Sequence, residues 1–115
     1  KVSFLTAVAA NLGLNGLRAM HGRWEKLAQS DENKAVFQLI TMRAVRLEKA
    51  HLQIMAPRLL APAGVFAFWA GPESESTAEA LALKSFPEMY FEAAHPYSLP
   101  GHSRKRSVMT WRMKL

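Results

Sequence analysis

Apolar residues recur along the first part of the chain at the spacing of a helix face. They stand three and four positions apart, at Val2, Leu5, Val8, Ala9 and Leu12. Gly13 follows them, and glycine is common just after the last turn of a helix. The pattern therefore predicts a helix over residues 2–12.

Two shorter elements are predicted next. The turn Asn15-Gly16 precedes residues 17–21, whose brevity and alternation favour a strand that stops at Gly22. A short helix is predicted over residues 24–28, and a polar loop over residues 29–34.

Two later segments are apolar on both sides. Residues 35–41 (AVFQLIT) and 65–70 (VFAFWA) have the composition of strands covered on both faces of a sheet, so the aromatic residues Phe66, Phe68 and Trp69 are expected in the core. Between these strands, residues 45–60 carry the broad apolar face of a helix, which Pro57 should bend or end. Residues 60–64 are expected to turn into the second strand.

The last third of the chain predicts one more helix, over residues 74–84, and two strands, over 89–97 and 106–113. Helices that alternate with strands indicate an α/β fold with a parallel sheet. The final two strands should close this sheet as a hairpin-like pair with one antiparallel edge strand. A length of 115 residues allows one domain, residues 1–115, and not two.

Composition narrows the class of protein. Half of the residues are hydrophobic and 21% are charged, as in ordinary globular proteins. No apolar run approaches the roughly 20 residues of a membrane span, and the first residues do not resemble a secretory signal. The absence of cysteine excludes disulfides and thiolate catalysis and suits the cytoplasm. The four histidines show no ligand-like spacing, so no metal site is expected.

The net charge of +6 and the pI near 10.1 suggest a polyanionic partner. The positive charge concentrates near the carboxy terminus, where no acidic residue lies between His102 and Lys114. The cations there are Arg104, Lys105, Arg106, Arg112 and Lys114. Two interpretations stay open, namely contact with nucleic-acid phosphates and a solvated edge strand that its charge protects against aggregation.

Three strings in the chain are similar to one family. They are KVSFLTAVAANLGLNGLRAMHGRWEKL, LITMRAV and YSLPGHSRKRSV, in this order and at this spacing. Together they resemble the bacterial 16S ribosomal RNA guanine-N7 methyltransferases, also called glucose-inhibited division protein B. The resemblance extends over essentially all 115 residues and corresponds to the carboxy-terminal half of that family's domain.

The resemblance implies a three-layer, Rossmann-like sheet of the class I methyltransferases that use S-adenosylmethionine. This sheet would be mostly parallel, and its amino-terminal strands would be missing from the chain. The family's glycine-rich loop and its ribose-binding acidic residue should precede Lys1. The glycines Gly13, Gly16 and Gly22 are too dispersed to form that loop.

The resemblance also implies roles for individual residues. Trp24 and Glu25 would line the adenine end of S-adenosylmethionine, largely through backbone groups, and Arg43 would contact the cofactor side of the cleft. The segments that carry these residues, HGRWE (residues 21–25) and TMRA (residues 41–44), each begin where a predicted strand ends. Open sheets bind ligands at this end of their strands. From the residues alone, Arg43 could equally be a solvated helix-start residue, and Glu25 could stabilise the amino end of its helix.

The same resemblance assigns the basic loop, His102, Arg104, Lys105 and Arg106, to RNA phosphates of the small ribosomal subunit. Methyl transfer to guanine N7 needs no general base, because this nitrogen already carries a lone pair. Ala70 departs from the family, which usually has a lysine there. The expected function is therefore ribosomal RNA methylation by a longer protein, of which this chain is an inactive part. The alternative is a non-catalytic module that binds RNA or protein.

Overall fold

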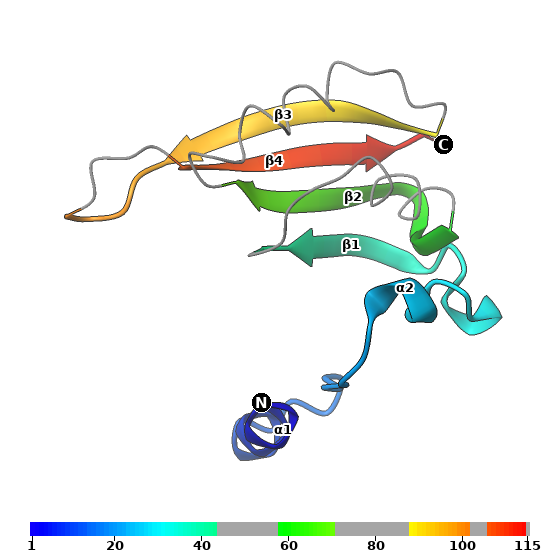
Figure 1. Cartoon of the computed structure of the whole chain (residues 1–115), viewed down its shortest axis with the longest axis vertical. Coiled ribbons are helices and arrows are strands. Elements are labelled where there is room, and N and C mark those ends of the chain that lie inside the picture. The colour runs from blue at the N-terminus through cyan, green and yellow to red at the C-terminus, as the bar shows by residue number, and fades with distance from the viewer. Residues whose placement is uncertain (44–57, 71–87, 102–105, 115) are drawn as a thin grey trace.

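The structure is a computed structural model, and it describes residues 1–43, 58–70, 88–101 and 106–114. These residues form two α-helices, a short 3-10 helix and one sheet (Figure 1). In chain order the elements are α1 (Val2–Asn11), α2 (Trp24–Leu27), η1 (Asp31–Asn33), β1 (Phe37–Met42), β2 (Leu60–Ala70), β3 (Met89–Tyr97) and β4 (Arg106–Met113).

Both described helices confirm the sequence predictions. At the end of α1 the backbone N–H of Leu14 donates to the Ala9 carbonyl at 2.9 Å, and that of Gly13 donates to the Ala10 carbonyl at 3.2 Å. Gly13 has the positive φ of 69° that this helix end requires. The glycine therefore ends the helix where the sequence places the stop.

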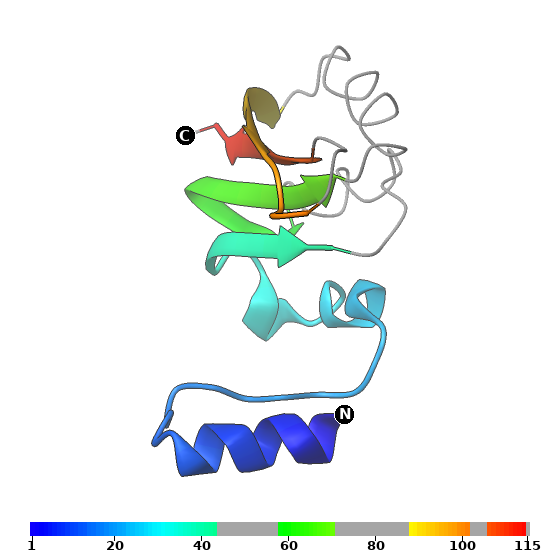
Figure 2. The ribbon, with the colours of Figure 1, turned by 90° about the vertical axis from the view of Figure 1, so that its left-hand side faces the viewer.

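The strand predicted over residues 17–21 is wrong, because the structure has irregular backbone there. This segment connects α1 to α2 and lies away from the sheet in both ribbon views (Figures 1 and 2). A strand needs a neighbouring strand to pair its backbone groups, and none of the described strands lies beside these residues. The alternating sequence alone does not supply that neighbour.

The sheet has the order β1-β2-β4-β3. β1 pairs with β2 in parallel, whereas β4 is antiparallel to both β2 and β3. The predicted hairpin-like pair and its antiparallel edge strand β3 are confirmed. The sheet is mixed, so the expectation of a mostly parallel sheet is not met among the described strands. β4 lies inside the sheet, and the interpretation of the basic segment as a charged edge strand is therefore wrong for residues 106–113.

The start of β2 differs from the prediction. β2 begins at Leu60, where the sequence predicts the end of one helix and a turn. Leu60 pairs with Phe37, but the next pair joins Val65 to Leu39, so the segment between them is irregular. Ala63 within it has a φ of 64°. The predicted turn is thus an irregularity inside a strand. The rest of the predicted helix, residues 45–57, and the predicted helix over residues 74–84 lie outside the described residues.

The core lies against one face of the sheet. Phe66, Phe68, Met109 and Trp111 are almost completely buried there. The Trp111 ring stacks on Phe66 at a centroid distance of 5.6 Å and meets Phe91 edge-on at 5.4 Å. Successive side chains of a strand point to opposite faces, so Trp69 points away from this core. Trp69 is 38% exposed, and its predicted burial is wrong.

Candidate functional site

A groove of about 460 Å³ runs along β1. Its lining comes from α2, β1 and the residues next to them, namely Trp24, Leu27, Phe37, Leu39, Ile40, Thr41, Met42, Arg43 and Leu59. Leu39 and Thr41 point to one face of the sheet, and Ile40 and Met42 point to the other. Since all four line it, the groove follows the strand edge that no other described strand pairs with.

The groove brings together two residues that are distant in the sequence. Trp24 is the first residue of α2, and Arg43 directly follows the last residue of β1. The end of β1 is a carboxyl end of the parallel pair, which is the position where α/β sheets bind ligands. Two of the three predicted cofactor residues therefore line one groove.

Glu25, the third predicted residue, follows Trp24 in α2 but is not among the lining residues. Its Oε2 atom is buried, and the structure gives it no hydrogen-bond partner. A buried acceptor without a donor is unfavourable by about 1–3 kcal/mol. Glu25 also lies in the first turn of α2, where a negative charge interacts favourably with the helix dipole.

The predicted RNA-binding residues are described only in part. His102, Arg104 and Lys105 lie outside the described residues. Arg106 is the first residue of β4 and pairs with Tyr97 of β3, while the next residue of β4, Ser107, pairs with Ala70. Arg106 therefore lies at the same edge of the sheet as the carboxyl end of β2. Its Nε atom is buried and has no partner in the structure.

Ala70, where the family resemblance leads one to expect a lysine, is buried at the end of β2. Its pairing partner Ser107 is also buried, and the Ser107 hydroxyl has no hydrogen-bond partner in the structure. The last residue of β2 is therefore small and apolar where a lysine was expected, and Arg106 is the described cation nearest to it along β4.

The lining residues Leu39 and Met42 were not predicted as part of a site. The sequence places residues 35–41 in a strand covered on both faces, yet Leu39 is 60% exposed. Within the described ranges, no cluster of three His, Asp or Glu side chains could hold a metal ion. Those same ranges contain no helix that is long and apolar enough to cross a membrane.

The relatives found by comparison with known proteins all carry the name of one kind of enzyme. No family profile matches the chain. The chain is 42% identical, over 99% of its length, to ribosomal RNA small subunit methyltransferase G 1 of Syntrophobacter fumaroxidans. It is 28% identical over 95% of its length to a ribosomal RNA small subunit methyltransferase G of an Exiguobacterium species, and 35% identical over 70% of its length to that of Deinococcus radiodurans.

These matches confirm the resemblance that the three sequence strings indicate. The chain spans about half the length of the first two relatives, 51% of one and 46% of the other.

Proposed function

The chain is 42% identical to about half of a ribosomal RNA small subunit methyltransferase G 1, and from this premise we propose that it is part of an enzyme that methylates small-subunit ribosomal RNA. In this proposal residues 1–115 are the carboxy-terminal portion of one methyltransferase domain. The complete domain is a three-layer, Rossmann-like sheet of a cytoplasmic bacterial protein. The observation that carries the proposal is the 42% identity, and the groove that both Trp24 and Arg43 line supports it.

The residues of the groove fit S-adenosylmethionine. An apolar wall beside Trp24 suits the flat adenine ring, and Trp24 and Glu25 would line the adenine end largely through backbone groups. Arg43, at the end of β1, can interact with a carboxylate or a polar group of the ligand. When bound, S-adenosylmethionine supplies the methyl group.

The proposed acceptor is guanine N7 of 16S ribosomal RNA. This nitrogen already carries a lone pair, so the chain needs to hold and orient the base rather than remove a proton from it. The contribution of the protein is then positioning and the electrostatics of the cleft. Arg106, together with His102, Arg104 and Lys105, would bind RNA phosphates near the carboxyl end of β2, without reading the sequence.

In this proposal the 115 residues alone do not methylate RNA. The glycine-rich loop and the acidic ribose-binding residue are expected in the missing amino-terminal half. The gene that encodes this chain is therefore expected to encode a strand and a glycine-rich turn ahead of Lys1. An unrelated domain in that place would contradict the proposal.

Calorimetric titration with S-adenosylmethionine tests the cofactor site in the complete polypeptide. We expect Arg43→Ala to weaken binding about tenfold, which corresponds to about 1.4 kcal/mol. Arg18→Ala is the matched control, because Arg18 is exposed and does not line the groove. Failure of the complete polypeptide to bind the cofactor would contradict the proposal, and mapping of modified nucleotides after gene deletion would identify the methylated base.

One observation favours a second candidate, a module that has lost catalysis and binds RNA or protein. Ala70 stands where a lysine was expected, so the end of β2 does not itself carry that cation. The same titration distinguishes the two functions, since a non-catalytic module would retain RNA binding and would not bind S-adenosylmethionine.

A further inference from the structure

The hairpin loop between β3 and β4 begins at the same edge of the sheet as Arg43. β3 runs parallel to β2, because both are antiparallel to β4, and β1 is also parallel to β2. The carboxyl ends of β1, β2 and β3 therefore meet at one edge, and Arg43 follows the end of β1 there. In Figure 1 the described part of the loop, residues 98–101, projects past the ends of β1 and β2.

This loop presents an exposed leucine on a defined turn. Leu99 is 41% exposed, and the turn residues Pro100 and Gly101 follow it. The ring of Pro100 fixes its own φ, and Gly101 has a φ of 80°, which residues with a side chain rarely adopt. The turn therefore restricts the positions that the leucine can take. We call residues 99–101 the leucine turn.

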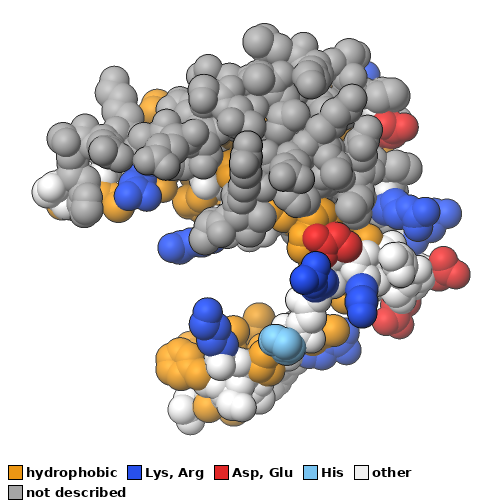
Figure 3. Space-filling view, in the orientation of Figure 1, with side chains coloured by type: hydrophobic (Ala, Val, Ile, Leu, Met, Phe, Trp, Pro, Cys, Tyr) orange, Lys and Arg blue, Asp and Glu red, His pale blue; other side chains and the backbone are white. Residues whose placement is uncertain are grey.

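The surroundings of the leucine turn are positively charged. Arg106, the first residue of β4, pairs with Tyr97, the last residue of β3, at the base of the loop. Among the described residues no carboxylate forms an ion pair with Arg106, and the sequence contains no acidic residue after Glu92. On the face drawn in Figure 3, Lys and Arg side chains lie at the end toward which β1 and β2 run, whereas the acidic side chains drawn lie around α2 and at the opposite end. RNA phosphates are attracted to such a surface, so an RNA strand bound there would lie beside Leu99.

The proposed acceptor atom is not accessible in a stacked and paired base. Guanine N7 lies on the major-groove edge of the base, and the major groove of an RNA helix is too deep and narrow for side chains to read. Enzymes that modify a base in a duplex therefore take it out of the stack, which costs free energy. Leucine and proline are among the residues that proteins insert between bases as apolar wedges.

We propose that Leu99 is a wedge residue, which packs between bases next to the target guanine and holds that guanine out of its stack. Pro100 and Gly101 fix the turn, and Arg106 binds a neighbouring phosphate. This inference rests on the proposed function, because it needs guanine N7 as the acceptor, and it adds a base contact to the phosphate contacts. Leu99 is a positioning residue, since it touches neither the methyl group nor N7.

The competing explanation is that Leu99 packs against another part of the complete polypeptide. Such a leucine would contribute to the stability of the folded protein and not to the handling of RNA. Single exposed leucines are also common on protein surfaces, and a leucine of that kind would have neither effect. The choice of RNA distinguishes these cases, because only the effect of a wedge depends on whether the target base is stacked.

The test compares methylation of two RNAs by the complete polypeptide. One is a folded fragment of 16S ribosomal RNA in which the target guanine is stacked, and the other is a short single strand that contains the same guanine. We expect Leu99→Ser to lower kcat/KM at least about tenfold on the folded fragment and less than about twofold on the single strand, because a single strand needs little unstacking. An equal change on the two RNAs, or no change on either, would overturn the inference.

Leu99→Met is the matched control at the same position. Methionine keeps a large apolar side chain of the kind that serves as a wedge, so this variant should stay within about twofold of the parent on both RNAs. A loss with methionine as large as that with serine would contradict the wedge.

Thermal unfolding separates the wedge from packing within the protein. The midpoint of Leu99→Ser should lie within about 2 °C of the parent, because Leu99 is exposed in a turn. A fall of more than about 5 °C would assign the leucine to protein packing and overturn the inference.

A fluorescent purine analogue beside the target guanine reports unstacking directly. We expect the parent polypeptide to raise the emission of the analogue in the folded fragment, and Leu99→Ser to give a rise at least about threefold smaller when all of the RNA is bound. The same rise with both proteins would count against the wedge.

Failure of the inference and failure of the proposed function give different results. If mapping after gene deletion finds no guanine that loses a methyl group, the proposed function fails and the inference falls with it. If the parent and Leu99→Ser methylate the folded fragment equally well, only the wedge is wrong and the proposed function stands.

Discussion

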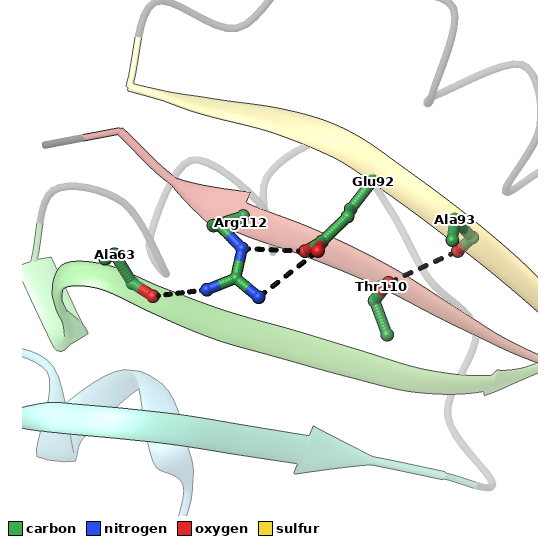
Figure 4. Close-up of polar contacts among 5 residues, drawn as sticks. All are labelled: Ala63, Glu92, Ala93, Thr110 and Arg112. Atoms are coloured by element: carbon green, nitrogen blue, oxygen red, sulfur yellow. Dashed lines mark hydrogen bonds and ion pairs between the residues drawn. The ribbon is translucent and has the colours of Figure 1, made fainter.

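Arg112 of β4 and Glu92 of β3 form a two-pronged ion pair across neighbouring strands (Figure 4). The Arg112 Nε donates to Oε2 of Glu92 at 2.9 Å, and a terminal guanidinium nitrogen donates to Oε1 at 3.2 Å. The other terminal nitrogen donates to the backbone carbonyl of Ala63 in β2 at 3.0 Å. The Arg112 side chain therefore links β4 to β3 and to the irregular start of β2.

The first prediction concerns this link. Arg112→Lys should lower the thermal midpoint more than Glu92→Gln, because a lysine cannot make the planar set of three hydrogen bonds. Glu92→Gln should have an effect of only about 2 °C, since both side chains are partly exposed and such pairs contribute little. A larger loss for Glu92→Gln than for Arg112→Lys would show that the contact with Ala63 is unimportant.

The pH dependence of this pair follows from the arginine. The hydrogen bond from Arg112 to Glu92, and then the charge of Glu92, raise the pKa of Arg112 above its ordinary value. A raised pKa stabilises the folded state below the unfolded pKa, and this stabilisation is lost only as the pH rises through the folded pKa. The contribution of the arginine should therefore stay constant through neutral pH, which midpoints measured across the neutral range can verify.

The second prediction concerns Gly64. A Cβ atom at this position would lie 2.8 Å from the Ala61 carbonyl oxygen and 3.0 Å from that of Phe37. Both neighbours are backbone atoms, so Gly64→Ala should destabilise the fold by about 1–3 kcal/mol in urea denaturation. Gly16→Ala is the matched control, because nothing lies within 4 Å of its Cβ position. The control should change the stability by less than about 0.5 kcal/mol.

The third prediction concerns Trp111, the largest fully buried side chain. Trp111→Ala should cost about 3–5 kcal/mol, because it removes the contacts with Phe66 and Phe91. The Nε1 atom of Trp111 is buried without a hydrogen-bond partner in the structure. Trp111→Phe removes this unpaired donor and keeps an aromatic ring, so it should cost only about 1–2 kcal/mol. Equal costs in denaturation would contradict this account.

The fourth prediction concerns Glu25 and has two parts. Glu25→Gln removes a charge whose Oε2 atom is buried without a donor, so the ligand-free protein should be at least as stable as the parent. The same change should alter the affinity for S-adenosylmethionine by less than about twofold, because the proposed contact of Glu25 runs through backbone groups. Thermal unfolding and titration of the complete polypeptide measure the two parts. Destabilisation of the ligand-free protein would show that the Glu25 charge stabilises the start of α2. A loss of affinity of about tenfold would show that the Glu25 side chain contacts the ligand, against this expectation.

The sequence by itself determined the local elements of this protein. The spacing of Leu5 and Leu12 with Gly13 is sufficient for α1 and its end, because a helix and its cap are made by residues close together in the chain. The apolar strings likewise located β1 and the second part of β2. The three sequence strings also indicated the resemblance that the comparison with relatives confirms.

Tertiary structure alone decided how these elements meet. The position of β4 between β2 and β3, and the groove shared by Trp24 and Arg43, depend on pairing between distant residues. Residues 17–21 have the alternating pattern of a strand but no described strand beside them, and Leu39 and Trp69 have apolar side chains but no cover. Strand pairing and burial both need a neighbouring segment, and a local sequence pattern does not contain that neighbour. For this reason the pattern predicted a strand over residues 17–21 and buried side chains at Leu39 and Trp69, which the structure does not have.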